Sequence, residues 1–257
     1  MYIVVTRSFP PEVGGMQNLM WGLTCSLAKY NLVKVFADFH ENYKEHDQKV
    51  SFSIDRVGGI KLLRKHRKSY LVNEFIKKNK NIKGIIADHW KSLELIRNEH
   101  FKKTKVFCLI HSKEINHELG STLNKRLIKS TNNADFVVAN SNFTKNLAIK
   151  VGIDPSKIVV IFPGIEKPTQ IKETSKIEAE KIFNNSFPKI ITVSRLDKRK
   201  GHDKILMLIK NLKPKFPKIK YISIGGGDEE KNLLKLSKEL KIEKDIFFLK
   251  NIEFNLK

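Results

Sequence analysis

Short runs of β-branched and aliphatic residues alternate along this chain with longer segments in which apolar residues recur every three or four positions. This alternation is typical of repeated strand–helix units, whose strands pair in parallel because each helix returns the chain to the same end of the sheet. It predicts an α/β fold. The chain has 257 residues, 40% of them hydrophobic, which is enough for one large domain or two smaller ones.

The first part of the chain contains a complete doubly wound set of such units. Its predicted strands are residues 2–6, 33–37, 82–87, 105–110, 135–139 and 157–161. After the first strand and a loop rich in Pro and Gly, apolar residues recur at helical spacing at Met16, Leu19, Met20, Leu23 and Leu27. We therefore predict a Rossmann-like N-terminal domain over residues 1–165.

Two prolines and a glycine in residues 162–169 interrupt the pattern, and we place a linker at residues 166–172. The pattern then restarts, with strands expected at residues 189–193, 219–224 and 245–249 and helices at about 201–212 and 228–240. This predicts a second Rossmann-like domain over residues 173–257. With three strands and no closing helix, we expect it to be incomplete.

The loop after the first strand carries adjacent glycines, Gly14 and Gly15, ahead of a predicted helix. Ligands of open α/β sheets bind at the carboxyl ends of the strands, where helix N-termini offer free N–H groups. Glycines there let the backbone approach a phosphate or a sugar, although a tight turn explains the pair equally well. Both are candidate ligand-binding residues.

A basic turn follows the first strand of the second domain and contains Arg195 and Lys200. If a diphosphate leaving group lies there, Arg195 offers a fork of donors and Lys200 a point charge, and both stabilise the negative charge that grows as the bond breaks. A solvated basic turn is the alternative in so Lys-rich a chain. The position at a strand end favours binding.

The next strand ends in Gly225, Gly226 and Gly227. This run does not match the dinucleotide-binding fingerprint, because Glu230 stands where that pattern needs a third Gly or an Ala, and no G-x-x-x-x-G-K-[ST] phosphate loop occurs. Hydride transfer and phosphate-loop NTPase chemistry both lose support. The three glycines suit a base or ribose that approaches the backbone.

His111 directly follows the predicted strand 105–110, which makes it a candidate catalytic residue by position, although a lone histidine is more often structural. Ser141 follows strand 135–139 and is expected to cap the next helix.

Basic residues dominate the chain, whose formal net charge is +22. Phosphorylated substrates, an acidic membrane surface and nucleic acid are candidate partners, and plain overuse of Lys on solvated faces is the simpler explanation. Residues 61–78 mix basic and apolar side chains. They predict a surface helix with its apolar stripe against the core, and the alternative is a helix that lies on anionic lipid.

With two cysteines, Cys25 and Cys108, the sequence predicts neither a disulfide framework nor a cysteine metal cluster, so a reducing cytoplasm fits best. No apolar run approaches the ~18 residues that span a bilayer. We expect a cytoplasmic protein, or one that is peripheral at the inner face of a membrane.

In this order, the motifs resemble those of glycosyltransferase family 4. The matching residues are Phe9-Pro10-Pro11 with Gly14-Gly15, His111, Asn140-Ser141 with Thr144, Phe162-Pro163-Gly164, Ser194-Arg195-Leu196 with Lys200-Gly201, and Gly225-Gly226-Gly227. None is specific alone, but the six follow the family's order at strand ends and span nearly the whole chain.

The resemblance implies the GT-B fold, in which two Rossmann-like domains face a cleft, and retaining transfer of a hexosyl group from a nucleotide-diphosphate sugar without a metal or other cofactor. It implies that Gly14 and Gly15 lie near the donor phosphates and sugar, and that His111 contacts the sugar near the reacting centre. It also implies that Arg195 and Lys200 bind the diphosphate. The acceptor would be a lipid or a glycan, and the first loop resembles that of the mannosyltransferase branch.

One departure concerns the glutamate pair that this family carries, spaced E-x7-E, since Glu253 has no such partner. We therefore expect a C-terminally truncated fragment of a longer reading frame, with weak or no activity alone. A nucleotide-sugar epimerase or a phosphorylase on the same fold stays an alternative. A basic nucleic-acid-binding protein is a further one, but no element interleaves cations with exposed aromatics, so nucleic acid is not expected.

Overall fold

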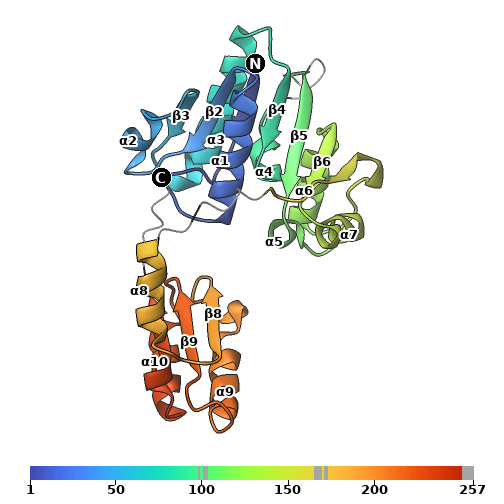
Figure 1. The fold of residues 1–257 in the computed structure, drawn as a ribbon. Coiled ribbons are helices and arrows are strands. Elements are labelled where there is room, and N and C mark those ends of the chain that lie inside the picture. The colour runs from blue at the N-terminus through green and yellow to red at the C-terminus, as the bar shows by residue number, and fades with distance from the viewer. Residues whose placement is uncertain (98, 101–103, 165–169, 171–172, 251–257) are drawn as a thin grey trace. The chain divides into compact units, whose positions relative to one another are not determined.

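The computed structural model describes residues 1–257 except 98, 101–103, 165–169, 171–172 and 251–257. The chain divides into two compact units, Met1–Glu166 and Lys167–Lys257 (Figure 1). Each consists of a parallel sheet with helices, so the predicted α/β class is confirmed. The linker predicted at residues 166–172 lies outside the described residues, apart from Gln170.

The first unit is built on a parallel sheet of seven strands. They are β1 (Tyr2–Val5), β2 (Val33–Asp38), β3 (Ser53–Val57), β4 (Gly84–Ala87), β5 (Lys105–Ile110), β6 (Phe136–Ala139) and β7 (Ile158–Val160), in the order β3-β2-β1-β4-β5-β6-β7. The chain runs outward from β1 to β3 and then resumes at β4 on the other side of β1. The carboxyl ends of β1 and β4 therefore flank the switch point at which ligands of such sheets bind.

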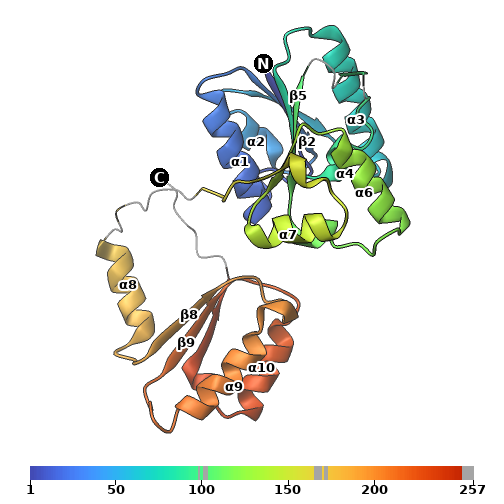
Figure 2. The same cartoon turned by 90° about the vertical axis from the view of Figure 1, so that its right-hand side faces the viewer.

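Helices cover both faces of this sheet (Figure 2). They are α1 (Gly15–Ala28), α2 (Tyr43–Asp47), α3 (Lys61–Lys78), α4 (Trp90–Leu93), α5 (Ser112–Ile115), α6 (Thr122–Asn132) and α7 (Asn142–Lys150), with a 3₁₀ turn at Pro155–Lys157. Along β1 the side chains alternate, so Ile3 and Val5 join one core cluster and Val4 joins the other. Met20 of α1 packs in the cluster of Val4.

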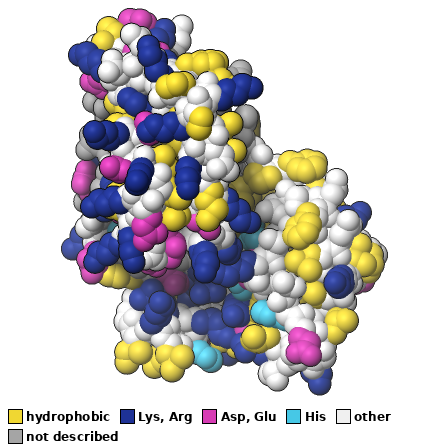
Figure 3. Space-filling view, turned by 90° about the horizontal axis from the view of Figure 1, so that it is seen from below, with side chains coloured by type: hydrophobic (Ala, Val, Ile, Leu, Met, Phe, Trp, Pro, Cys, Tyr) yellow, Lys and Arg dark blue, Asp and Glu magenta, His cyan; other side chains and the backbone are white. Residues whose placement is uncertain are grey.

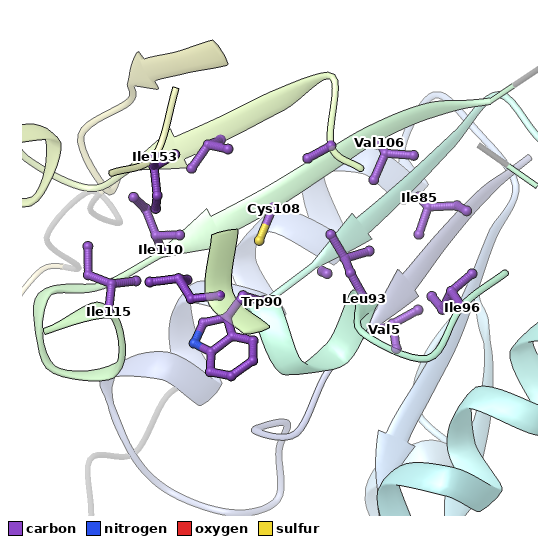
Figure 4. Close-up of a cluster of buried hydrophobic side chains, with 14 of the residues drawn as sticks. Val5, Ile85, Trp90, Leu93, Ile96, Val106, Cys108, Ile110, Ile115 and Ile153 are labelled. Carbon is purple, nitrogen blue, oxygen red and sulfur yellow. The ribbon is translucent and has the colours of Figure 1, made fainter. Parts of the chain in front are cut away.

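Trp90 anchors the larger of these clusters (Figure 4). Its side chain is fully buried, and its indole N–H donates to the Glu114 carbonyl over 3.0 Å. The Ser130 hydroxyl in turn donates to the Trp90 carbonyl over 2.6 Å. These bonds connect α4, which follows β4, to α5 and α6, which follow β5. They therefore hold together the segments at the carboxyl edge of the sheet.

The structure adds one strand that the sequence pattern does not predict. β3 is an edge strand, and its polar residues pair laterally: Asp55 accepts from Lys34 over 2.6 Å, and Arg56 binds Asp47 of α2 over 2.7 Å. The strand contains too few apolar residues to be predicted from the sequence pattern. Its polar side chains form ion pairs with neighbouring elements instead of burying an apolar face.

Helix α3 has the predicted bounds, but most of the apolar residues expected on its inner stripe are on the outside. Val72 and Ile76 are buried in the core. In contrast, Leu62, Leu63, Tyr70 and Leu71 are exposed.

The second unit has a three-stranded parallel sheet in the order β10-β9-β8. Its elements are α8 (Glu173–Phe183), β8 (Lys189–Val193), α9 (His202–Leu212), β9 (Lys220–Ile224), α10 (Glu230–Glu239) and β10 (Ile246–Leu249), with 3₁₀ turns at Lys198–Lys200 and Glu243–Asp245. Leu206 and Ile209 of α9, Leu233 of α10 and Tyr221 of β9 form its core. The predicted strands and helices of this unit are confirmed within a few residues.

No helix in the described part of the chain is long and apolar enough to cross a membrane. Lys and Arg side chains cover much of the face seen in Figure 3, as the net charge leads one to expect.

Candidate functional site

Asp88 connects the carboxyl ends of two neighbouring strands of the first sheet, β1 and β4. It directly follows β4, it is buried, and one carboxylate oxygen accepts from the Thr6 hydroxyl over 2.8 Å and from the Arg7 amide over 2.7 Å. The other oxygen accepts from the Ser92 hydroxyl over 2.7 Å. These bonds join β1 to β4 at the switch point, so Asp88 fixes where the first loop leaves the sheet.

Two histidines belong to the same edge: His89 follows Asp88 in the sequence, and the charge of Asp88 acts on His111. Burial, with the nearby charges of Arg7 and Lys91, lowers the pKa of His89 to about 3, and its Nδ1 caps α4 by accepting from the Lys91 amide over 2.9 Å. Burial also lowers the pKa of His111, although the Asp88 carboxylate opposes this effect. Both rings are therefore neutral at neutral pH.

His111 follows β5, as the sequence predicts, and its Nδ1 lies 3.4 Å from the Asn140 amide nitrogen at the end of β6. Asn140 is held by the Thr144 hydroxyl over 2.7 Å, and Ser141 caps α7 by accepting from the Thr144 amide over 3.1 Å, which confirms its expected role. The other ring nitrogen of His111 is buried without a partner in the described structure. Its hydrogen-bonding capacity is therefore unsatisfied in the described structure.

Glu114 lies beside His111 and accepts a hydrogen bond from the His111 backbone amide. Burial raises the pKa of the Glu114 carboxyl to about 7, and the negative charge of Asp88 adds to this. Near neutral pH the Glu114 carboxyl is therefore partly protonated, at the same edge of the sheet as His111.

We expect the stability of the protein to fall by about 1–3 kcal/mol as the pH rises from 5 to 8 because of Glu114. The folded-state pKa lies above the unfolded value, so the contribution is complete at low pH and is lost as the pH rises through about 7. Glu114→Gln keeps the acceptor for His111 and should remove this loss. Urea unfolding at both pH values measures this loss of stability, and the exposed Glu118→Gln is the control. An equal fall in the free energy of unfolding between the two pH values in wild type and Glu114→Gln would contradict the assignment.

Two buried cations, Lys68 and Arg56, hold the first loop through its backbone carbonyls. Lys68 of α3 donates to the Thr6 carbonyl over 2.5 Å and to Asp38 over 2.6 Å, and burial lowers its pKa. Arg56 of β3 donates to the Pro10 carbonyl. Beyond these contacts, Gly15 starts α1 with open space where a Cβ would stand, whereas a Cβ on Gly14 would meet the Gln17 side chain. Gly15 is thus the glycine of this pair whose Cα is open to a ligand.

The two loops of the second unit approach each other so closely that two of the three glycines are needed for packing. A Cβ on Gly225, whose φ is +135°, would lie 2.2 Å from the Ser194 carbonyl oxygen, and a Cβ on Gly227 would lie 2.3 Å from that of Leu196. The Leu196 amide also donates to the Gly226 carbonyl over 3.0 Å. Only Gly226 has open space around its Cα.

Arg195 and Lys200 are both exposed on this loop pair. Between them, Asp197 accepts from the Arg199 amide over 3.0 Å and pairs with its guanidinium at 3.3 Å, which leaves Arg195 and Lys200 without a carboxylate partner in the described structure. Gly201 then enters α9 with φ +70°, a conformation that favours glycine.

A buried histidine supports the Arg195 loop. His202, the first residue of α9, places Nε2 3.2 Å from the Arg195 carbonyl and 3.1 Å from the Ser194 hydroxyl. Its Nδ1 lies 2.9 Å from the Tyr221 hydroxyl of β9. A ring that donates from Nε2 and accepts at Nδ1 satisfies these contacts and fixes the backbone from which Arg195 extends.

The structure thus groups the predicted site residues by unit: Gly14, Gly15 and His111 belong to the carboxyl edge of the first sheet, and the remaining candidates to one loop pair of the second. The described residues include no group of three or more His, Cys, Asp or Glu side chains placed to hold a metal ion. Sequence reasoning missed Asp88 and His202. Asp88 could have been noticed, because it ends an apolar strand at the same edge as His111.

Two family models match the chain. One, described as "Glycosyltransferase Family 4", matches residues 13–167, more than half of the chain, and the other, "Glycosyl transferases group 1", matches residues 173–257. The chain is 20% identical over 263 residues to a GDP-mannose-dependent alpha-(1-6)-phosphatidylinositol monomannoside mannosyltransferase of Mycolicibacterium smegmatis, an alignment that covers 97% of this chain and 67% of the relative. An uncharacterized glycosyltransferase of Methanocaldococcus jannaschii is 30% identical over 174 residues, which are 64% of this chain and 41% of that protein.

Solved glycosyltransferases share the fold. Anabaena HepE, crystallised with UDP, superposes with a TM-score of 0.76 at 18% identity, over 97% of this chain and 68% of HepE. A glycosyltransferase from Rickettsia africae superposes with a TM-score of 0.74 at 19% identity, over 98% of this chain and 69% of that structure. The fold is that of GT-B glycosyltransferases, and with the family match over the first unit, the chain belongs to glycosyltransferase family 4.

Proposed function

We propose that this chain binds a nucleotide-diphosphate sugar through the loop pair of its second unit and serves the transfer of a hexosyl group to an acceptor with retention of configuration. The observation that carries the proposal is the combination of two exposed cations outside the ion pair of this turn, Arg195 and Lys200, with the open backbone at Gly226. Cations suit a diphosphate, and a glycine without a neighbour at its Cα leaves room for a base or ribose. Relatives support this: HepE has been crystallised with UDP-glucose, and the mycobacterial relative is GDP-mannose-dependent.

In this proposal each unit has its own task in catalysis. Arg195 and Lys200 neutralise the charge that develops on the leaving diphosphate, so no metal is needed. His111, neutral and with one ring nitrogen unpaired, bonds a sugar hydroxyl near the reacting carbon. Gly14 and Gly15 lie near the donor phosphates and the transferred sugar, where the N-terminus of α1 favours negative charge.

For the acceptor we propose a lipid-linked one met at the cytoplasmic face of a membrane, or a glycan. The support is that the mycobacterial relative is a phosphatidylinositol monomannoside mannosyltransferase. This chain spans 67% of that relative's length, so the proposal concerns the part that these residues play.

A donor panel tests the proposal. We expect the thermal unfolding midpoint of the chain to rise with one of the UDP-, GDP- or ADP-sugars and to rise less with the matching nucleoside monophosphate, because the diphosphate contacts are lost. Product analysis after incubation with the labelled donor, with and without acceptor, separates transfer from epimerisation. If no member of the panel shifts the midpoint, the second unit does not bind a donor as proposed.

A further inference from the structure

Four cationic side chains gather around α4, at the carboxyl edge of the first sheet. Arg7 follows β1, and Lys91 lies in α4 itself, after β4. Lys65 of α3 donates to the Glu94 carboxylate over 2.8 Å. Arg126 of α6 donates to the same carboxylate over 2.6 and 3.0 Å. Two of the four cations therefore share one carboxylate.

The other two cations, Arg7 and Lys91, have no such partner. Among the described residues, no carboxylate forms an ion pair with either side chain. The Lys91 ammonium instead lies 5.1 Å from the centroid of the buried Trp90 ring. Burial lowers the pKa of Lys91, the charges of Arg7 and Arg126 lower it further, and Glu94 offsets part of this effect. The cations around α4 thus repel one another, and a bound anion would relieve that repulsion.

The backbone at Arg7 and the backbone at Lys91 are held by one carboxylate, that of Asp88. The Arg7 amide donates to it over 2.7 Å, and the hydroxyl of Ser92, which follows Lys91 in α4, donates to it over 2.7 Å. His89 caps the same turn by accepting from the Lys91 amide over 2.9 Å. The two unpaired cations therefore extend from preorganised backbone, which lowers the cost of binding a ligand between them.

This pair of cations adjoins the histidine that is proposed to contact the transferred sugar. The charges of Arg7 and Lys91 act on His89, and so does the charge of His111. An anion held by Arg7 and Lys91 would therefore lie near the reacting centre, on the first unit. This position suits the acceptor of the transfer, because the diphosphate of the donor is assigned to the second unit.

We infer that Arg7 and Lys91 form a subsite for a phosphate monoester on the acceptor. The inference rests on the proposed function for the transfer, but not for the binding of phosphate itself. A phosphate monoester carries about two negative charges near neutral pH, which two unpaired cations match, whereas a carboxylate carries only one. Arg supplies a planar fork of donors to phosphate oxygens, and Lys supplies a point charge. The acceptor class is thus a phosphorylated sugar or polyol.

Thermal unfolding in inorganic phosphate tests the subsite on the 257-residue chain. The starting point is the variant Arg195→Ala/Lys200→Ala, in which phosphate is not held at the proposed donor site. At constant ionic strength, phosphate in place of chloride should raise its unfolding midpoint by about 2–4 °C. Adding Arg7→Gln/Lys91→Gln should abolish this rise, because both cations that bind the anion are lost.

The matched control is Lys77→Gln/Lys78→Gln in the same background. It removes the same charge from the exposed end of α3, which precedes β4 and therefore lies away from the carboxyl edge. This control should keep the rise with phosphate. A rise that survives Arg7→Gln/Lys91→Gln, or that is lost equally in the control, would show general attraction to a basic protein and overturn the inference.

Two further measurements separate the acceptor from other sources of phosphate. Glucose 6-phosphate should raise the midpoint at least as much as inorganic phosphate, and glucose should not; no rise with the ester would contradict the inferred class. In the otherwise wild-type chain, Arg7→Gln/Lys91→Gln should keep the midpoint shift with the nucleotide sugar. Loss of that shift would assign these cations to the donor and overturn the inference. Absence of a donor shift in wild type, with the phosphate results as expected, would count against the proposed function alone.

Discussion

Replacing Arg195 with Ala should weaken binding of the nucleotide-diphosphate sugar by about 10- to 100-fold, and Lys200→Ala should have an effect of similar size. A hydrogen bond to a charged group contributes about 1.5–3 kcal/mol, and neither side chain has a carboxylate partner in the described structure that would compete with the diphosphate. Isothermal titration with the donor found in the nucleotide-sugar panel measures the loss.

The control for these variants is Arg199→Ala in the same turn. Its guanidinium is already paired with Asp197 at 3.3 Å, so its removal should change donor affinity little. All three side chains are exposed, and none of the variants should alter the unfolding midpoint in the absence of ligand. Wild-type affinity in Arg195→Ala and Lys200→Ala would show that the diphosphate is held elsewhere.

Gly225→Ala should destabilise the second unit by about 2–5 kcal/mol, since the new Cβ overlaps the Ser194 carbonyl and the residue has a backbone conformation that alanine rarely adopts. Gly227→Ala should cost about 1–3 kcal/mol from the overlap with Leu196 alone. Urea unfolding followed by circular dichroism gives both values.

Gly226→Ala is the internal control of this series. Its Cβ would meet nothing within 4 Å, so stability should stay within about 0.5 kcal/mol of wild type. The same variant should reduce donor affinity, because its methyl group enters the space assigned to the base or ribose. If Gly225→Ala and Gly226→Ala unfold alike, the glycines do not divide into packing and ligand-facing positions as the structure indicates.

The strands that lie inside the sheets could be predicted from sequence because burial on both faces requires uninterrupted apolar runs. β3 could not, since its Asp55 and Arg56 are satisfied by lateral ion pairs. The same limit applies to α3, where apolar residues at helical spacing were expected to face the core. Leu62 and Tyr70 show that spacing identifies a stripe without saying what covers it.

For the candidate site, the sequence predicts only which residues stand at the carboxyl ends of strands. His111 and the three glycines could be found because parallel strands place their carboxyl ends at one edge. Asp88 and His202 could not be assigned a role, since their partners Thr6 and Tyr221 stand 82 and 19 positions away along the chain. The sequence also could not distinguish Gly226 from its neighbours, because the distinction depends on the carbonyls of a different loop.

Lys68 and Arg56 engage backbone carbonyl groups of the first loop. With the Thr6 and Pro10 carbonyls occupied by Lys68 and Arg56, two of the loop's electron-rich oxygens are turned away from solvent. At the far end of the loop, the first turn of α1 has backbone N–H groups without an acceptor inside the helix, and no side chain caps them. β3 and α3 therefore determine, from outside the loop, which of its backbone polar groups are already engaged by the protein itself.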